Sequence, residues 1–125
     1  MSQIIRRGGC QRWSDVVVHG GTAYWVEVAE NLAVDARGQV EQVLTQIDAT
    51  LAQVGSDRTR ILQVLVYLAP EVAQAALDEP WDAWVPAGHA PVRATVRAGL
   101  AAGCHVEMVV TAAANTADPR YTTGR

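Results

Sequence analysis

The chain of 125 residues has no phenylalanine and no long apolar run, and it has only two cysteines. Cys10 and Cys104 lie far apart and outside any metal-ligand spacing, which argues against a disulfide framework or a zinc site. No apolar segment reaches the length of a membrane span, and the first residues lack the hydrophobic core of a signal peptide, so we expect a cytoplasmic protein without membrane contact. Because the sequence has no glycine-rich phosphate loop or metal cluster, no cofactor and no metal are predicted.

An excess of positive charge is also lacking. Thirteen acidic residues outnumber ten basic ones, and the formal net charge is -3. The basic spots at Arg6, Arg7 and Arg12 and at Arg120 and Arg125 are too few to give the electrostatic footprint of a nucleic-acid-binding protein. The length fits one domain and leaves no room for a separate cofactor domain.

Two elements of the first half have specific local signals. Residues 15–29, DVVVHGGTAYWVEVA, form two runs of β-forming residues around Gly20 and Gly21, a pair that permits the positive φ angles of a tight hairpin. Along residues 38–54 the apolar side chains recur at helical spacing, and Gly55 follows as a stop signal. We therefore predict a β-hairpin followed by a long helix.

The second half begins with a compact apolar run, RILQVLVYLAP at residues 60–70, which predicts a strand inside the sheet, covered on both faces. Residues 71–85 then predict a helix whose apolar face places Trp81 and Trp84 in the core. Because Pro80 lies within this segment, we expect a kink or two shorter helices, the second capped by Asp78.

The last two predicted strands, at residues 91–100 and 104–113, are expected to pair through a tight connection at residues 101–103. The resulting order, β, β-hairpin, α, β, α, β, β, predicts an α/β (α+β) fold with one mixed sheet and two helices packed on one face. Residues 1–114 form the domain, and residues 115–125 form a polar, flexible tail. The other sheet face would expose Val, Trp and Ala side chains, as is typical of a surface that contacts another subunit.

Two arginines four residues apart, in VRATVR, are the first candidates for a function. Strand alternation places Arg93, Thr95 and Arg97 on one face and the apolar residues between them on the other. We expect the apolar residues under the helices and the arginines on the uncovered face. If that face is an interface, Arg93 requires an anionic partner, which is either protein or ligand.

The expected hairpin separates the roles of the two arginines. A turn near residue 102 places Arg97 opposite Glu107 as a cross-strand ion pair, whereas Arg93 faces Thr111, which carries no charge. Arg93 is therefore the better candidate for binding a ligand. Arg97 is expected to position Glu107.

Four segments, GGTAYWVEVAENL, WDAWVPAGHAP, APVRATV and HVEMVVTAA, together resemble the RidA/YjgF family, and in particular its YoaB-like branch, over roughly residues 4–113. The resemblance implies a chorismate-mutase-like fold and a homotrimer with small-molecule clefts between subunits. It also implies hydrolysis of reactive 2-imino and enamino acids to 2-oxo acids and ammonia, without a cofactor. Some relatives are labelled endoribonucleases or translation inhibitors.

Within this resemblance, Arg93 matches the arginine that holds the substrate carboxylate, and Glu107 matches the glutamate that handles water and protons. A guanidinium grips a carboxylate through two parallel hydrogen bonds, and a carboxylate suits proton transfer. In one hairpin the two residues would be about 13 Å apart. Either a bulge or a cleft shared between chains is needed, and we favour the shared cleft.

Four positions of the expected substrate pocket depart from the deaminase pattern. Trp13 stands where those relatives have tyrosine, Val26 where they have serine, Thr95 where they have cysteine, and Asp78 where they have asparagine. Arg93, which would bind the substrate carboxylate, is kept, while these four residues lining the pocket differ. The change points to a larger or more apolar acid as substrate. The carboxylate of Asp78 would disfavour a second anion.

Three functions remain open at this stage. The first is an imine or enamine deaminase that uses Arg93 and Glu107. The second is a non-catalytic module that binds or senses small carboxylates, favoured by the altered pocket wall. The third is an endoribonuclease or translation inhibitor, for which this acidic chain lacks a basic groove with stacking aromatics.

Overall fold

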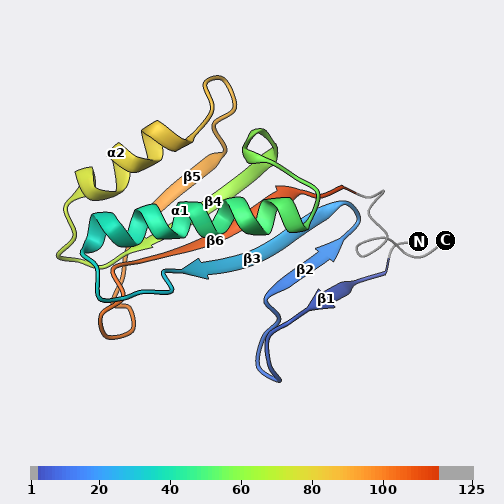
Figure 1. Cartoon of the computed structure of the whole chain (residues 1–125), viewed down its shortest axis with the longest axis horizontal. Helices are drawn as coiled ribbons and strands as arrows, with labels where there is room; N and C mark the ends of the chain where they lie inside the picture. The colour runs from blue at the N-terminus through green and yellow to red at the C-terminus, as the bar shows by residue number, and fades with distance from the viewer. Residues whose placement is uncertain (1–2, 116–125) are drawn as a thin grey trace.

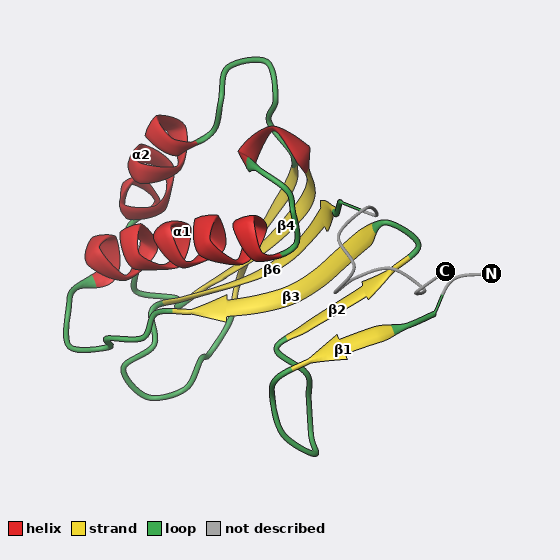
Figure 2. Cartoon of the chain, turned by 45° about the vertical axis from the view of Figure 1, so that its right-hand side comes forward, coloured by secondary structure: helices red, strands yellow, loops and turns green. Residues whose placement is uncertain are grey.

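The computed structural model describes residues 3–115 and shows a six-stranded sheet with two helices on one face (Figure 1, Figure 2). The strands are β1 (Ile5–Arg7), β2 (Val16–His19), β3 (Thr22–Val28), β4 (Ile61–Leu68), β5 (Val92–Arg97) and β6 (Val106–Ala113). The helices are α1 (Ala36–Gln53), a 3-10 turn (Arg58–Arg60) and α2 (Gln74–Trp84). The strand order is β1-β2-β3-β6-β4-β5, and of these pairs β4 and β5 are parallel. The predicted fold class and element order are confirmed, while residues 116–125 of the predicted tail lie outside the described residues.

The first hairpin and α1 form where their local signals lie. Gly20 and Gly21 have φ angles of 59° and 79°, and the turn they make joins β2 to β3. Positive φ at both central positions suits the right-handed twist of the two strands. Helix α1 begins after Asp35, whose Oδ1 accepts a hydrogen bond from the amide of Gly38 at 2.9 Å. Its end is followed by Gly55 with a φ of 68°, as the stop signal predicts.

Strand β4 lies inside the sheet, between β6 and β5, as predicted. Val64, Val66 and Leu68 are completely buried on its helix-facing side. The alternate positions Leu65 and Tyr67 keep partial exposure on the other side. The apolar run predicted a strand covered on both faces, but within residues 3–115 only the helix-facing side of β4 is covered.

The predicted hairpin of the last two strands is wrong, because β4 separates β5 from β6. Strand β5 is the edge strand and pairs in parallel with β4, so that Arg97 lies beside Leu68. Glu107 on β6 lies instead beside Tyr67 of β4. Helix α2 is the crossover between β4 and β5, and a helical crossover returns the chain parallel to the strand it left. The expected Arg97–Glu107 pair and the expected position of Arg93 opposite Thr111 are both wrong.

The two faces of β5 are also the reverse of the prediction. Arg93 pairs with Val64 and Thr95 with Val66, and paired residues point to the same side of a sheet. Arg93, Thr95 and Arg97 therefore lie on the helix side. Val92 and Val96 lie on the uncovered side, where they are 67% and 45% exposed. The reversal is physically accessible because β5 is at the sheet margin, where long guanidinium side chains reach polar groups of α2 and the turn before it.

Helix α2 runs without interruption through Pro80, so the two predicted shorter helices are not found. Asp78 lies in the middle of the helix and caps nothing, and the residue before the helix, Ala73, provides no side-chain cap. A proline inside a helix removes one backbone hydrogen bond. Leu77 and Trp81 pack in the core and Pro80 itself is buried, and this burial keeps the short helix in place despite that loss.

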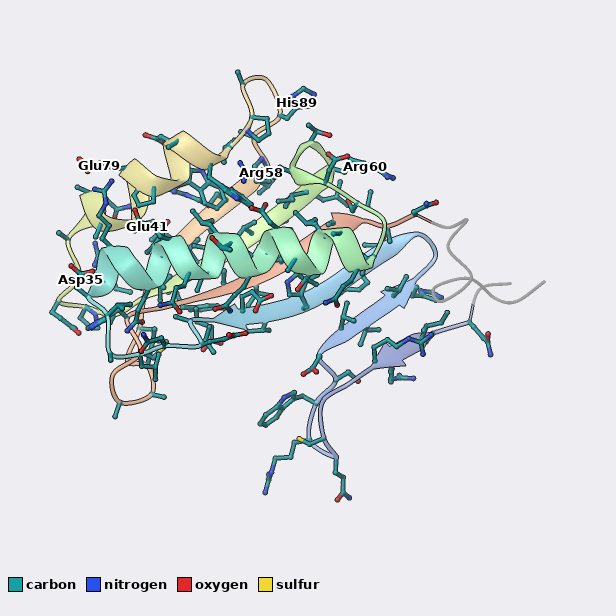
Figure 3. All side chains as sticks on the ribbon, viewed as in Figure 1. Asp35, Glu41, Arg58, Arg60, Glu79 and His89 are labelled. Carbon is teal, nitrogen blue, oxygen red and sulfur yellow. The ribbon has the colours of Figure 1, made fainter. Side chains whose placement is uncertain are left out.

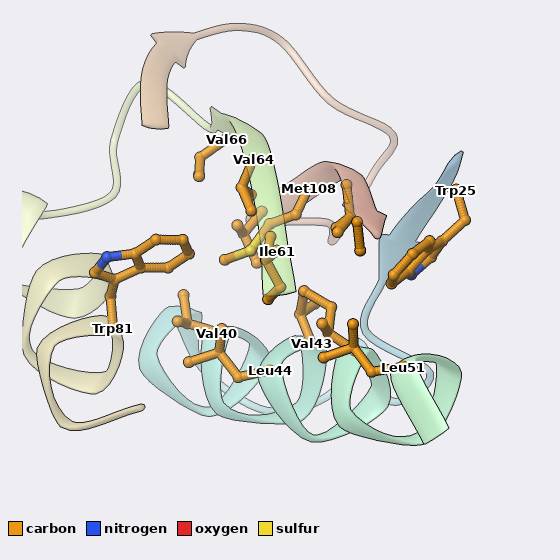
Figure 4. Close-up of a cluster of buried hydrophobic side chains, with 14 of the residues drawn as sticks. Trp25, Val40, Val43, Leu44, Leu51, Ile61, Val64, Val66, Trp81 and Met108 are labelled. Atoms are coloured by element: carbon orange, nitrogen blue, oxygen red, sulfur yellow. The ribbon is translucent and has the colours of Figure 1, made fainter. Parts of the chain in front are cut away.

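The hydrophobic core lies between the two helices and one face of the sheet (Figure 4). Helix α1 contributes Val40, Val43 and Leu44, and Figure 4 shows Trp25 at one end of the cluster and Trp81 at the other. The predicted core positions of Trp81 and Trp84 are confirmed, with exposures of 7% and 8%.

No helix of residues 3–115 covers the opposite face of the sheet, as predicted. Its exposed apolar side chains come mainly from β3 and β5: Tyr24, Val26, Val28, Val92 and Val96. Tryptophan, which the sequence also placed there, is absent from the strands of this face, because Trp25 points into the core. We call this surface the uncovered face.

Candidate functional site

Arg93 lies on the edge strand β5, and two side chains of α2 contact its guanidinium group. Its Nη2 donates a hydrogen bond to Oδ1 of Asp78 at 2.9 Å. Its guanidinium carbon lies 5.1 Å from the centroid of the Trp81 ring, close enough for a cation–π contact. The side chain of Arg93 is 24% exposed, so this charge lies at the border between the core and solvent.

The spacing of polar and aromatic residues on α2 produces this arrangement. Asp78 and Trp81 are three residues apart, and Gln74 precedes Asp78 by four, so all three lie on the helix face directed at β5. Gln74 donates a hydrogen bond from Nε2 to the same Oδ1 of Asp78 at 3.2 Å. The carboxylate is thereby fixed in position between Gln74 and Arg93.

Most of the hydrogen-bonding capacity of Arg93 is unused in residues 3–115. A guanidinium carries five N–H donors, and Arg93 makes one hydrogen bond, to Asp78. Its Nη1 is buried without any partner. A buried donor without a partner costs free energy, so an oxygen-rich group from a ligand or another chain would stabilise this side chain.

Arg97, by contrast, has its partners within the chain. Its Nη1 donates to the carbonyl of Ala69 at 3.2 Å and to the carbonyl of Val72, and its Nη2 donates to Oε1 of Gln74 at 3.1 Å. These contacts tie the edge strand to the turn that precedes α2. Arg97 is therefore a structural residue, and the expectation that it positions Glu107 is wrong.

Glu107 lies on the opposite side of the sheet from Arg93. It follows the buried Val106 on β6 and pairs with Val28 of β3 and Tyr67 of β4. Within residues 3–115 its carboxylate makes no hydrogen bond or ion pair. One chain therefore does not bring Glu107 and Arg93 together around a small ligand.

The remaining predicted pocket residues are divided between three places. Thr95 is on the helix side of β5, between the two arginines. Val26 is on the uncovered face, 52% exposed, and pairs with Val109. Trp13 is 64% exposed in the loop between β1 and β2. The prediction did not connect Trp81 with Arg93, although its spacing from Asp78 on α2 carried that information.

The outer surface of the two helices carries a second group of charges (Figure 3). Arg58 makes two hydrogen bonds of 2.8 Å to Asp48 of α1, and its guanidinium carbon lies 5.2 Å from the ring centroid of Trp84. Trp84 donates from Nε1 to the same carboxylate at 3.2 Å. These side chains satisfy one another, so they connect α1 to α2 and leave no free anchor for a ligand.

The thiols provide no metal site. Cys10 is exposed and Cys104 is buried, and burial raises the pKa of the Cys104 thiol. Among residues 3–115 no three His, Cys, Asp or Glu side chains gather closely enough to hold a metal ion. Within the same range, no helix has both the length and the apolar character needed to cross a membrane.

Comparison with known proteins places this geometry in a family. The family model described as Endoribonuclease L-PSP matches residues 9–114. The RutC family protein YoaB of Escherichia coli is 50% identical over 97 residues, which cover 78% of this chain and 85% of that protein.

Solved structures agree in both fold and sequence. A putative translation initiation inhibitor from Salmonella typhimurium superposes with a TM-score of 0.82 at 46% identity, covering 89% of this chain and 97% of that one. A YjgF family member from Neisseria meningitidis gives a TM-score of 0.84 at 37% identity, covering 90% and 96% of the two chains. The chain therefore belongs to the RidA/YjgF family, whose model carries the description Endoribonuclease L-PSP, and within it resembles the YoaB-like proteins.

Proposed function

We propose that this protein hydrolyses reactive 2-imino and enamino acids to 2-oxo acids and ammonia, with the substrate carboxylate held by Arg93. The observation that carries the proposal is the partly exposed guanidinium of Arg93, which has a single hydrogen bond and a buried Nη1 without a partner. Such a group favours an anionic ligand with two oxygens in one plane. Family membership supports the choice of a small carboxylic acid as that ligand.

The chemistry requires positioning and proton transfer. Water adds to the carbon of the protonated C=N group and forms a carbinolamine, and the proton released from the water passes to Glu107. The C–N bond then breaks as Glu107 returns the proton to the departing nitrogen. The proton of the carbinolamine hydroxyl passes to the released ammonia as the carbonyl of the 2-oxo acid forms, so ammonium leaves and Glu107 is again ionised. Arg93 contributes by fixing the reacting carbon relative to the water, and Glu107 contributes general acid–base catalysis.

The opposite locations of these two residues call for more than one chain. We propose a closed homotrimer in which Arg93 of one chain and Glu107 of the next border one cleft. The apolar residues of the uncovered face, such as Tyr24, Val26 and Val96, support an interface between copies, because a contiguous apolar surface of this kind is typical of subunit contacts.

A carboxylate-binding module without turnover is the second candidate. The altered pocket positions favour it, because Trp13, Val26 and Thr95 replace residues of the deaminase pattern while the carboxylate-binding Arg93 is kept. Tight binding of 2-oxo acids without ammonia release would support this alternative. An endoribonuclease activity, the term in the family description, ranks lower, because Arg37 and Arg58 on the outer helical surface are each paired with carboxylates.

The test generates imino acids of graded side-chain size with an amino-acid oxidase and measures 2-oxo acid and ammonia formation. We expect acceleration by the wild-type protein and its loss in Arg93→Ala. The matched control is Arg60→Ala, which removes an exposed arginine of the 3-10 turn that makes no contact with Arg93, Asp78 or Trp81, and it should keep full activity. Light scattering checks that each variant keeps the oligomeric state of the wild type. No acceleration by a folded, oligomeric wild-type protein would refute the proposal.

A further inference from the structure

Beside the proposed carboxylate anchor lies a negative charge of the protein itself. Asp78 is 38% exposed, and its Oδ1 accepts the hydrogen bonds from Arg93 and Gln74. Its second oxygen, Oδ2, has no hydrogen-bond partner within residues 3–115. The site therefore presents a cation and an anion side by side, each with unused hydrogen-bonding capacity.

This pair of charges affects ligands of different charge in opposite ways. A 2-oxo acid carries one carboxylate and no positive charge, so Arg93 attracts it while Asp78 repels it. A protonated 2-imino acid carries a carboxylate and a cationic nitrogen on the neighbouring carbon. Such a zwitterion matches the adjacent charges of Arg93 and Asp78, because each of its charged groups finds the opposite charge.

We propose that Asp78 makes this site selective for zwitterionic ligands, accepting a hydrogen bond from the iminium nitrogen while Arg93 holds the carboxylate. This inference rests on the proposed function and specifies the protonation state of the substrate. The protonated iminium is the more electrophilic form toward water, so the selected form is also the reactive one. After hydrolysis the positive charge departs with the nitrogen, and the remaining 2-oxo acid faces Asp78 uncompensated, which favours product release.

The neutral, isosteric variant Asp78→Asn isolates this effect. The amide oxygen of asparagine can still accept the hydrogen bond from Arg93, so the substitution removes the charge and retains the geometry. Asp82→Asn is the matched control, because Asp82 is an exposed carboxylate on the same helix, outside the contact with Arg93. Asp78→Glu retains the charge at the same position and serves as the conservative variant.

The probes are 2-aminobutyrate, a stable zwitterion, and 2-oxobutyrate, the anion with the same carbon skeleton. Calorimetry or ligand-detected NMR gives their dissociation constants for the full-length wild type and variants near neutral pH. We expect the wild type to prefer 2-aminobutyrate, and Asp78→Asn to shift the ratio of the two constants by about three- to tenfold toward 2-oxobutyrate. Asp82→Asn and Asp78→Glu should keep the preference of the wild type, and thermal melts verify that every variant is folded.

Two failures can be told apart. If both ligands bind and lose affinity in Arg93→Ala, but their ratio is the same in wild type and Asp78→Asn, the inference is wrong and the carboxylate anchor stands. If binding does not depend on Arg93, or neither ligand binds the wild type at millimolar concentration, the anchor itself is wrong and the inference falls with it.

Discussion

Mixing two inactive variants tests whether Arg93 and Glu107 work across a subunit boundary. In one chain their strands are separated by β4, and Arg93 is level with Val110, three residues beyond Glu107. Two strand spacings and three residue steps place their backbones about 14 Å apart, with the side chains on opposite faces. A single chain therefore cannot apply both groups to one small substrate.

The expected magnitude follows from counting intact sites. In Arg93→Ala every site lacks the anchor, and in Glu107→Gln every site lacks the proton-transfer group, so each variant alone should be inactive. When equal amounts are refolded together and assemble at random, about one quarter of the shared sites combine an intact Arg93 with an intact Glu107. The mixture should recover about one quarter of wild-type turnover in the imino-acid assay.

The control mixes Arg93→Ala with the double variant that carries both substitutions, which cannot form an intact site. Native mass spectrometry of chains with different mass tags confirms that mixed oligomers have formed. Absence of recovered activity in oligomers shown to be mixed would refute the shared cleft. Full activity of Glu107→Gln alone would remove Glu107 from the mechanism.

Two further predictions concern the packing around the site. Trp81→Ala should reduce the free energy of unfolding by about 3–5 kcal/mol in denaturant titrations, because it leaves a cavity in the core and removes the ring beside Arg93. A loss below about 1 kcal/mol would contradict this packing role. At pH 8 a thiol reagent should modify the exposed Cys10 quickly and the buried Cys104 far more slowly. Burial shields the Cys104 thiol and raises its pKa, so little of it is ionised at pH values below that raised pKa. Equal rates in the folded protein would contradict the burial of Cys104.

Elements with strong local signals were predictable from the sequence. The Gly20-Gly21 pair fixes the turn between β2 and β3, and the apolar period of residues 38–54 fixes the helix that becomes α1. Both depend on interactions between residues close in sequence, which composition and spacing record directly. The interior position of β4 also follows from its continuous apolar run.

The pairing of β5 and β6 was not predictable from their proximity in sequence. A tight connection favours a hairpin, but the preceding β4–α2–β5 unit already places β5 beside β4 in parallel. The remaining free edge of β4 then pairs with β6, which also completes the ladder with β3. Giving the crossover rule priority over the short connection would have produced the observed order.

The candidate site was only partly predictable for a related reason. Alternation along VRATVR correctly grouped Arg93 with Thr95 and Arg97, but it does not say which face of the sheet the group occupies. Apolar residues usually point to the helices, and here Val92 and Val96 do not. An edge strand can make this exchange because its outward-facing apolar residues can be covered by another copy of the chain.

This exchange of faces would allow β5 to take part in both the proposed assembly and the proposed ligand binding. Val92 and Val96 expose apolar surface of β5 on the uncovered face, while Arg93 on the other side of the strand contacts Asp78 and Trp81 of α2. If the arginines had faced the neighbour, a subunit contact would have buried two guanidinium groups at a high desolvation cost. The observed orientation keeps the anchor at the margin of the apolar contact. In the proposed homotrimer, a ligand would reach Arg93 there while Glu107 of a second chain closes the cleft.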